Sequence, residues 1–249
     1  MAELTPMMKQ YLEIKRNNPD SILFFRLGDF YEMFADDAKL ASRELDLTLT
    51  SRDKDPNKFA EEKVPMCGIP YHASESYIAR LIAKGYKVAI CEQMEDPAAA
   101  KGLVERDIIR IVTPGTLMES SMLEEGRNNF IAAVCLEGEG AGVCFCDIST
   151  GEVSAAAFAG AGWEEHLSNE LGRFSPREVV LNAAAWDCRN LRDFLKVRLE
   201  CRCEQGNEAD FAPDRAWDLC RNQFRAGLDD LPPEGEYAVR ACGGLLTYL

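Results

Sequence analysis

The stretch Gly28-Asp29-Phe30-Tyr31-Glu32-Met33-Phe34 decides how the first part of this chain folds, and it follows the apolar run Ser21-Ile22-Leu23-Phe24-Phe25-Arg26-Leu27. The apolar run is typical of a buried strand. Phe30 and Glu32 point the same way only on an extended or turn backbone, because residues at this spacing diverge by about 200° on a helix. The sequence therefore predicts an exposed turn with a flat apolar ring beside a carboxylate, which suits a flat, hydrogen-bonding partner such as a nucleobase.

A second interpretation of the same stretch stays open on the residues alone. Phe30, Tyr31 and Phe34 are also typical of core aromatics at the start of a helix, and their period by itself favours that interpretation. In that case none of the three rings would be available to a partner.

Helices and strands are predicted on both sides of this stretch. Thr5-Pro6 is typical of a helix start, with proline at the first helical position. The prolines and glycine of 64–72 predict a shaped loop without regular structure. Ser74 is predicted to cap a helix that Gly85 ends. The patterns together give an α/β domain whose sheet is covered by helices, with helices over 6–17, 36–45 and 74–84, strands over 21–27, 47–50, 86–91 and 107–113, and a polar loop over 52–63.

The second half predicts another α/β unit. Residues 116–128 have no clear period and suit a linker, and Gly138-Glu139-Gly140 is a hairpin signal. The apolar end, Cys242 to Leu249, has no stop signal, so we expect the natural sequence to continue beyond it. The predicted elements after the linker are strands over 130–135, 142–148, 152–156, 178–181 and 198–203, and helices over 162–172, over 190–196 and from 213 onward.

Length and composition set the class of protein. The 249 residues suffice for two domains with cores of their own, and 47% hydrophobic and 28% charged residues are ordinary for a globular protein. No apolar run approaches the ~18 residues of a membrane span. The first residues lack a basic segment followed by an apolar one, so we expect a cytosolic protein with reduced cysteines.

The net charge of −14 argues against general binding to nucleic acid through phosphate contacts. The charge is uneven: residues 1–120 hold 16 Lys and Arg against 20 Asp and Glu, and the rest hold 12 against 22. If one part contacts a polyanion it is the first, where Arg52, Lys54, Lys58 and Lys63 cluster. The competing interpretation of that cluster is a solvated surface loop.

The motifs of common catalytic sites are missing from the sequence. Gly138-x-Gly140-x-Gly142 lacks the third glycine of the dinucleotide fingerprint at the right position, and the sequence holds no P-loop. Two histidines and no Ser/His/Asp or Cys/His arrangement leave nucleophilic catalysis unsupported. The ten cysteines form no C-x-x-C pair, so buried thiols are favoured over a zinc site. Asp147 and Glu152 flank a turn, as in a metal-dependent nuclease, but ordinary hairpin residues are favoured there too.

Residues 5–115 resemble the N-terminal mismatch-recognition domain of the bacterial MutS family of DNA mismatch repair proteins. The second half resembles the connector domain of that family more loosely, through 147–151. The matching motifs are Thr5-Pro6-Met7-Met8 with Gln10-Tyr11-Leu12, Phe25 to Phe34, Pro65-Met66-Cys67-Gly68-Ile69-Pro70-Tyr71-His72, Ala89-Ile90-Cys91-Glu92-Gln93, and Arg110-Ile111-Val112-Thr113-Pro114-Gly115-Thr116.

The resemblance implies roles for the residues of the opening stretch. In the family, the Phe of a Phe-x-Glu motif enters the minor groove and stacks on a mispaired base, and the Glu hydrogen-bonds to that base. Carried over, these are Phe30 and Glu32. The further expectations are that Gly28 allows the turn, that Tyr31 and Phe34 anchor it from the core, and that the residues flanking the DNA are Met33, Met66 and Arg110.

The resemblance also implies an organisation. It gives a mixed-sheet mismatch-recognition domain over 1–115, a linker over 116–128 and an RNase H-like connector domain over 129–249, without the clamp and ATPase domains of the family. No enzyme activity, cofactor or metal is then expected in this chain, since ATP and Mg²⁺ belong to the ATPase domain. The implied partners are mismatched duplex DNA, a second copy of the full-length protein and a MutL-type repair protein on the connector, in a bacterial cytoplasm beside the nucleoid and at no membrane. The alternatives are an RNase H-like nuclease that uses Asp147 and Glu152, and a purely structural interaction module.

Overall fold

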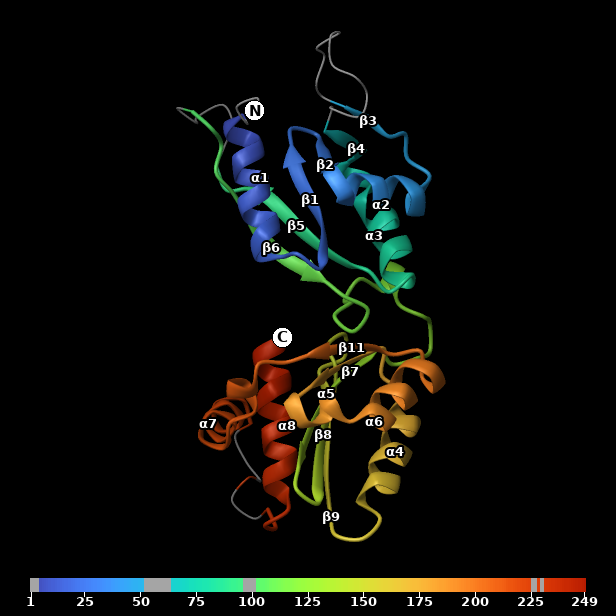
Figure 1. Cartoon of the computed structure of the whole chain (residues 1–249), viewed down its shortest axis with the longest axis vertical. Helices are drawn as coiled ribbons and strands as arrows, with labels where there is room; N and C mark the ends of the chain where they lie inside the picture. The colour runs from blue at the N-terminus through green and yellow to red at the C-terminus, as the bar shows by residue number, and fades with distance from the viewer. Residues whose placement is uncertain (1–4, 52–63, 96–101, 225–227, 229–230) are drawn as a thin grey trace. The chain divides into compact units, whose positions relative to one another are not determined.

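The computed structural model describes residues 5–51, 64–95, 102–224, 228 and 231–249 (Figure 1). The chain forms two compact units, Met1–Pro114 and Gly115–Leu249. Each unit contains one mixed sheet with helices, so the predicted α/β class and the two-domain organisation are confirmed. The predicted loop and basic cluster over 52–63 lie outside the described residues. Within the described part of the chain, no helix has the length and apolarity of a membrane span.

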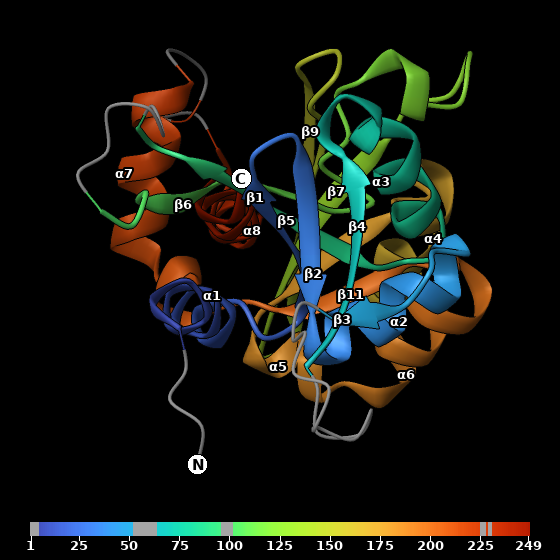
Figure 2. The ribbon, with the colours of Figure 1, turned by 90° about the horizontal axis from the view of Figure 1, so that it is seen from above.

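The first unit is built on a six-stranded sheet in the order β3-β4-β2-β1-β5-β6. Strands β1 and β5 are parallel, and the other neighbours are antiparallel. Helix α1 packs on one face of the sheet, and α2 and α3 on the other (Figure 2). The bounds are α1 Pro6–Asn17, β1 Ser21–Leu27, β2 Phe30–Phe34, α2 Ala35–Leu45, β3 Thr50–Ser51, β4 Pro65–Pro70, α3 Ser74–Ala83, β5 Lys87–Gln93 and β6 Arg106–Val112.

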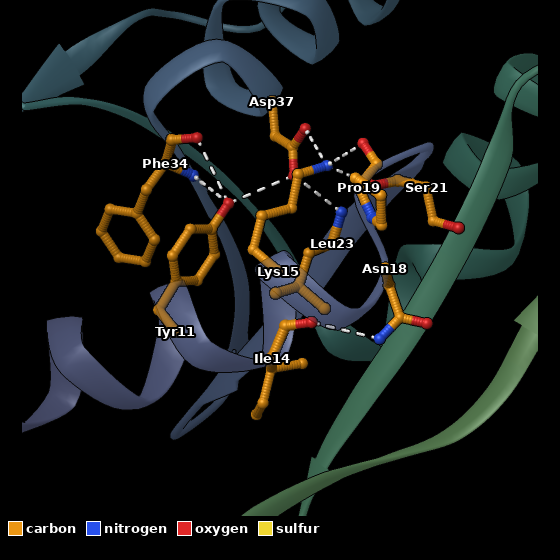
Figure 3. Close-up of polar contacts among 9 residues, drawn as sticks. All are labelled: Tyr11, Ile14, Lys15, Asn18, Pro19, Ser21, Leu23, Phe34 and Asp37. Atoms are coloured by element: carbon orange, nitrogen blue, oxygen red, sulfur yellow. Dashed lines mark hydrogen bonds and ion pairs between the residues drawn. The ribbon is translucent and has the colours of Figure 1, made fainter.

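The carboxylate of Asp37 joins three of these elements (Figure 3). Its oxygens accept hydrogen bonds from the Tyr11 hydroxyl of α1 at 3.2 Å and from the Leu23 N–H of β1 at 3.0 Å. The ammonium of Lys15 lies 2.9 Å from the same carboxylate. Because the side chain of Asp37 is only 9% exposed, these partners offset the cost of burying its charge.

Several expectations for the first unit are corrected. The predicted loop over 64–72 contains strand β4, followed by a 3-10 turn over Tyr71–Ala73. Prolines are tolerated there because they stand at the two ends of β4, and β3 pairs only with Pro65 and Met66. The strand predicted over 47–50 is reduced to Thr50–Ser51. Ser74 is the first helical residue of α3 and does not cap it, whereas Thr5 caps α1 as predicted.

The second unit has a five-stranded sheet in the order β11-β10-β7-β8-β9. Strands β7 to β9 form an antiparallel meander, and β10 runs parallel to β7 and β11. The unit has two hydrophobic core clusters among its described residues. One contains Leu167 of α4, and the other contains Val239 of α8. The bounds are β7 Phe130–Glu137, β8 Gly140–Asp147, β9 Glu152–Ala159, α4 Trp163–Phe174, β10 Glu178–Leu181, α5 Ala183–Asp187, α6 Arg189–Asp193, β11 Arg202–Gln205, α7 Pro213–Gln223 and α8 Gly235–Tyr248.

The region after β10 differs from its prediction. The helix expected over 190–196 is divided into α6 and a π-helical turn over Phe194–Arg198, and the short helix α5 before it was not predicted. The strand expected over 198–203 begins only at Arg202. Leu191 and Leu195 are both buried, and their spacing of four residues places them on one side of the helical segment.

Candidate nucleic-acid interface

The stretch that opened the sequence analysis forms the second strand of a tight hairpin. Leu27 and Phe30 are the last paired residues of β1 and β2, and Gly28 and Asp29 make the two-residue loop. Gly28 has a φ of +58°, a conformation that glycine adopts at little cost. The prediction of an extended backbone is confirmed, and the alternative of a helix start at Phe30 is wrong, because α2 begins only at Ala35.

Alternation along β2 separates the exposed side chains from the buried ones. Phe30 is 46% exposed, whereas Tyr31 is 5% and Met33 is 0% exposed. Glu32 is half-buried and shares its face of the strand with Phe30. Phe34 lies on that face too, but its ring meets the Tyr11 ring edge-on at a centroid distance of 5.0 Å. The strand therefore presents one exposed ring beside one carboxylate and buries the rest.

Strand β4 leaves room in front of this pair. Pro70 stands opposite Phe30, and Gly68 stands opposite Glu32. A Cβ atom at Gly68 would lie 3.4 Å from Glu32 Cγ and 3.3 Å from the Tyr31 carbonyl oxygen, so any larger residue would crowd the carboxylate. Sequence reasoning missed Gly68 and Pro70 as parts of the site. The signal was the Pro65–His72 motif, which we had interpreted as a loop.

Tyr31 anchors the strand from the opposite face of the sheet. Its ring packs 5.9 Å from that of Phe24, and its hydroxyl donates a hydrogen bond to Glu92 Oε1. Burial of the ring, with the carboxylate of Glu92 as the second cause, raises the pKa of the Tyr31 hydroxyl above its ordinary value. The hydroxyl therefore keeps its proton and remains a donor at neutral pH.

Of the residues expected to flank DNA, Met33 and Arg110 are placed elsewhere. Met33 is a core residue because it alternates to the face of the sheet that α2 and α3 cover. Arg110 pairs with Ile90 beyond a β-bulge in β5–β6, which turns it to the face opposite Glu32. It also lies three strands from β2, about 14 Å at ordinary strand spacing. Met66 is half-buried and packs against the cluster that contains Phe34.

Asp147 has a structural role in the second unit. Its carboxylate accepts hydrogen bonds from the Ser149 N–H at 2.9 Å, the Ser149 hydroxyl at 2.6 Å and the Asn129 N–H at 3.1 Å. Glu152 accepts from the side chain of Asn128 at 3.0 Å. The two carboxylates therefore hold the turn and the start of β7, and the nuclease alternative is not favoured.

The ten cysteines are free thiols, and most of them are buried. The two exceptions are Cys188 and Cys203. Among the described residues, no three His, Cys, Asp or Glu side chains gather as a metal ion would require. Burial raises the pKa of the Cys67 thiol to about 11 and that of the Cys91 thiol to about 12. These two thiols are weak nucleophiles at neutral pH.

The comparisons with known proteins agree on one family. The family model for MutS domain I matches residues 5–121, and that for MutS domain II matches residues 129–249. The DNA mismatch repair protein MutS of Acetivibrio thermocellus is 46% identical over all 249 residues of the chain. The proteins of the same name from Clostridium tetani and Symbiobacterium thermophilum are 53% identical over 99% and 58% identical over 72% of the chain. The chain spans 28%, 27% and 20% of the lengths of these three relatives.

Proposed function

We propose that this chain, which belongs to the MutS family of DNA mismatch repair proteins, recognises mispaired or unpaired bases in duplex DNA through Phe30 and Glu32. The observation that carries the proposal is the exposure of Phe30. A phenyl ring that is 46% exposed at the tip of a hairpin, next to a half-buried carboxylate, has little use in a core. Inserted between base pairs, the same ring gains stacking energy.

The selectivity of this site follows from the deformability of DNA. Inserting an apolar ring requires a base step to unstack and the duplex to bend, and both cost less where pairing is already poor. Stacking is worth roughly 1–3 kcal/mol per base in either duplex. A single wedge such as Phe30 can therefore detect many different mismatches without reading a base code.

Glu32 adds a test of the base that Phe30 displaces. A carboxylate among phosphates is unfavourable unless it gains a specific partner. We propose that Glu32 is at least partly protonated when DNA is bound, since the phosphates raise the pKa of the carboxyl, and that it then donates a hydrogen bond to a base nitrogen. On paired DNA the same group stays charged and repels the duplex.

The wider roles of the family complete the proposal. Mismatched DNA, a second copy of the full-length protein and a MutL-type repair protein on the second unit are the partners, in the cytoplasm beside the nucleoid. ATP and Mg²⁺ act in an ATPase domain of the full-length protein, so the chain by itself needs no cofactor and is no enzyme. Because 129–249 is strongly acidic, the chain alone binds DNA weakly at physiological salt.

The test of the wedge compares Phe30→Ala with Leu49→Ala in a full-length protein that carries this chain. Leu49 is a matched control, because it has the same exposure of 46% in the same unit. We expect Phe30→Ala to weaken binding to a mismatched duplex by roughly 5- to 150-fold and binding to a matched duplex much less, and Leu49→Ala to change neither. An equal loss on both duplexes, or no loss, would remove Phe30 from the site.

Glu32→Gln tests the carboxyl separately. The amide keeps a donor and removes the charge, so we expect overall DNA affinity to hold or rise while the ratio of mismatched to matched affinity falls. Titration of both duplexes at two salt concentrations measures this. A Gln variant that loses all DNA binding contradicts the proposed protonation.

A further inference from the structure

We propose that Arg26, Tyr31, Tyr71 and Glu92 form a brace behind the hairpin and position Phe30 for insertion into DNA. These four residues are called the hairpin brace below. The inference rests on the proposed role of Phe30 and extends it to positioning residues that do not themselves contact DNA.

The brace lies on the face of the sheet opposite Phe30. Tyr31 pairs directly with Arg26 across β1 and β2, so their side chains share one face. Phe25 pairs with Cys91, which places Glu92 beside Arg26 on the next strand. Phe30 pairs with Leu27 and projects to the other side. The three side chains thus form a polar row across β2, β1 and β5, directly behind the wedge.

Arg26 makes four of the contacts in the brace. Its guanidinium lies 3.7 Å from the centroid of the Tyr71 ring and 5.6 Å from that of Tyr31. It pairs with the Glu92 carboxylate at 3.1 Å. Its Nε–H also donates a hydrogen bond to the Gly28 carbonyl oxygen at 2.5 Å. One planar cation therefore links the hairpin turn, the 3-10 turn that follows β4, and β5.

Tyr71 ties the other end of the turn. Its backbone N–H donates to the Asp29 carbonyl oxygen at 2.9 Å, so both loop residues, Gly28 and Asp29, are hydrogen-bonded to the brace. The Tyr31 hydroxyl completes the row by donating to the Glu92 oxygen that faces Arg26. These polar contacts hold the loop from behind.

The turn has little other support. A Cβ atom at Gly28 would meet no described atom within 4 Å, and Phe30 at the first position of β2 is 46% exposed. A ring that must separate stacked bases needs a fixed direction, because each degree of freedom frozen on binding lowers affinity. The brace supplies that rigidity before DNA arrives.

The decisive variant is Tyr31→Phe, with Tyr11→Phe as its matched control. Each change removes one hydroxyl that donates to a carboxylate in the same unit, but Tyr11 donates to Asp37, away from the hairpin loop. In a full-length protein that carries this chain, we expect Tyr31→Phe to lower the ratio of mismatched to matched affinity by about tenfold. We expect Tyr11→Phe to leave that ratio unchanged, although it should lower the melting temperature about as much as Tyr31→Phe does.

A spectroscopic readout separates positioning from stability. 2-Aminopurine placed next to the mismatch changes its fluorescence when a ring inserts beside it, so a loosened Phe30 gives a smaller change at saturating protein. Arg26→Lys should also give a smaller fluorescence change than the unchanged protein, because an ammonium can pair with Glu92 but cannot also stack on Tyr71 and hold the Gly28 carbonyl. Full signal and an unchanged affinity ratio in both brace variants would overturn the inference.

The outcomes for the brace and for the wedge are distinguishable. If Phe30→Ala selectively weakens mismatch binding while Tyr31→Phe and Arg26→Lys do not, the brace is wrong and the wedge stands. If Phe30→Ala has no selective effect, the proposed function fails and the brace fails with it. Equal losses in Tyr31→Phe and Tyr11→Phe would reduce the brace to a contribution to stability and so refute it.

Discussion

Asp37→Ala should destabilise the first unit by about 3 kcal/mol. The Leu23 N–H at 3.0 Å then loses its acceptor inside the core, which costs about 1–3 kcal/mol. Tyr11 keeps the Phe34 carbonyl as an acceptor at 3.3 Å, and Lys15 keeps the Ser21 carbonyl at 2.6 Å. Their lost bonds to Asp37 therefore add less to the destabilisation than breaking a buried ion pair with no other acceptor would. For a domain of this size the loss corresponds to a fall in Tm of about 12 °C or more.

The chain carries probes that report the two units separately. Cys67 and Cys91 are buried in the first unit, so their modification by a thiol reagent follows its opening. All tryptophans lie in the second unit, so their fluorescence follows that unit alone; they are Trp163, Trp186 and Trp217. Asp37→Ala should speed the modification of Cys67 and Cys91 across a series of urea concentrations. The urea midpoint of unfolding that tryptophan fluorescence reports should not change.

Two further variants test the reasoning about Asp37. Asp37→Asn keeps an acceptor for the Leu23 N–H but loses the charge, so about half of the stability loss is expected. Asp36→Ala is the matched control on the same helix, because the Asp36 side chain is 94% exposed and its ion pair with Lys39 lies on the surface; it should change stability by less than about 0.5 kcal/mol. Similar thiol protection in Asp37→Ala and Asp36→Ala would refute the assignment of Asp37 as a buried junction.

Three other predictions concern the second unit. A Cβ atom at Gly142 would lie 1.8 Å from the Tyr237 carbonyl oxygen of α8, so Gly142→Ala should cost at least about 3 kcal/mol and shift the tryptophan transition; an unshifted transition would mean that α8 can move. Asp147→Ala should lower the Tm of this unit by removing three hydrogen bonds, and added Mg²⁺ should leave both proteins without nuclease activity; Mg²⁺-dependent cleavage lost in the variant would revive the nuclease alternative. The Cys201 thiol and the Lys196 ammonium lower the pKa of the Cys203 thiol. Iodoacetamide should therefore alkylate Cys203 at lower pH than an ordinary thiol, and Lys196→Ala should move that pH profile upward. An unmoved profile would exclude the ammonium as a cause.

Local sequence signals predicted the parts of the fold that local interactions determine. The cap at Thr5, the apolar strand over 21–27 and the glycine turn at 28 all follow from neighbours in the chain. Strand β4 was missed because its prolines and glycine are unfavourable locally, and only pairing with β2 makes a strand of it. Its position beside Phe30 was missed for the same reason.

The same distinction between local signals and long-range pairing applies to the residues of the candidate site. Phe30 and Glu32 follow from a spacing of two on an extended backbone, so sequence alone placed them on one face. Met33 lies in the core because alternation along β2 turns it to the face opposite Phe30 and Glu32. The orientation of Arg110 depends on a β-bulge between distant strands, which no local pattern reports.

The two-sided character of β2 limits how this segment can evolve. Substitutions between Gly28 and Phe34 act one side chain at a time, but inserting or deleting a single residue would exchange the two faces of the strand. Tyr31 would then point outward, and the ring of Phe30 would enter the core. Natural variation here should therefore be free in residue type at some positions and fixed in length, so a length change would mark relatives that lack an exposed ring beside a carboxylate at this place.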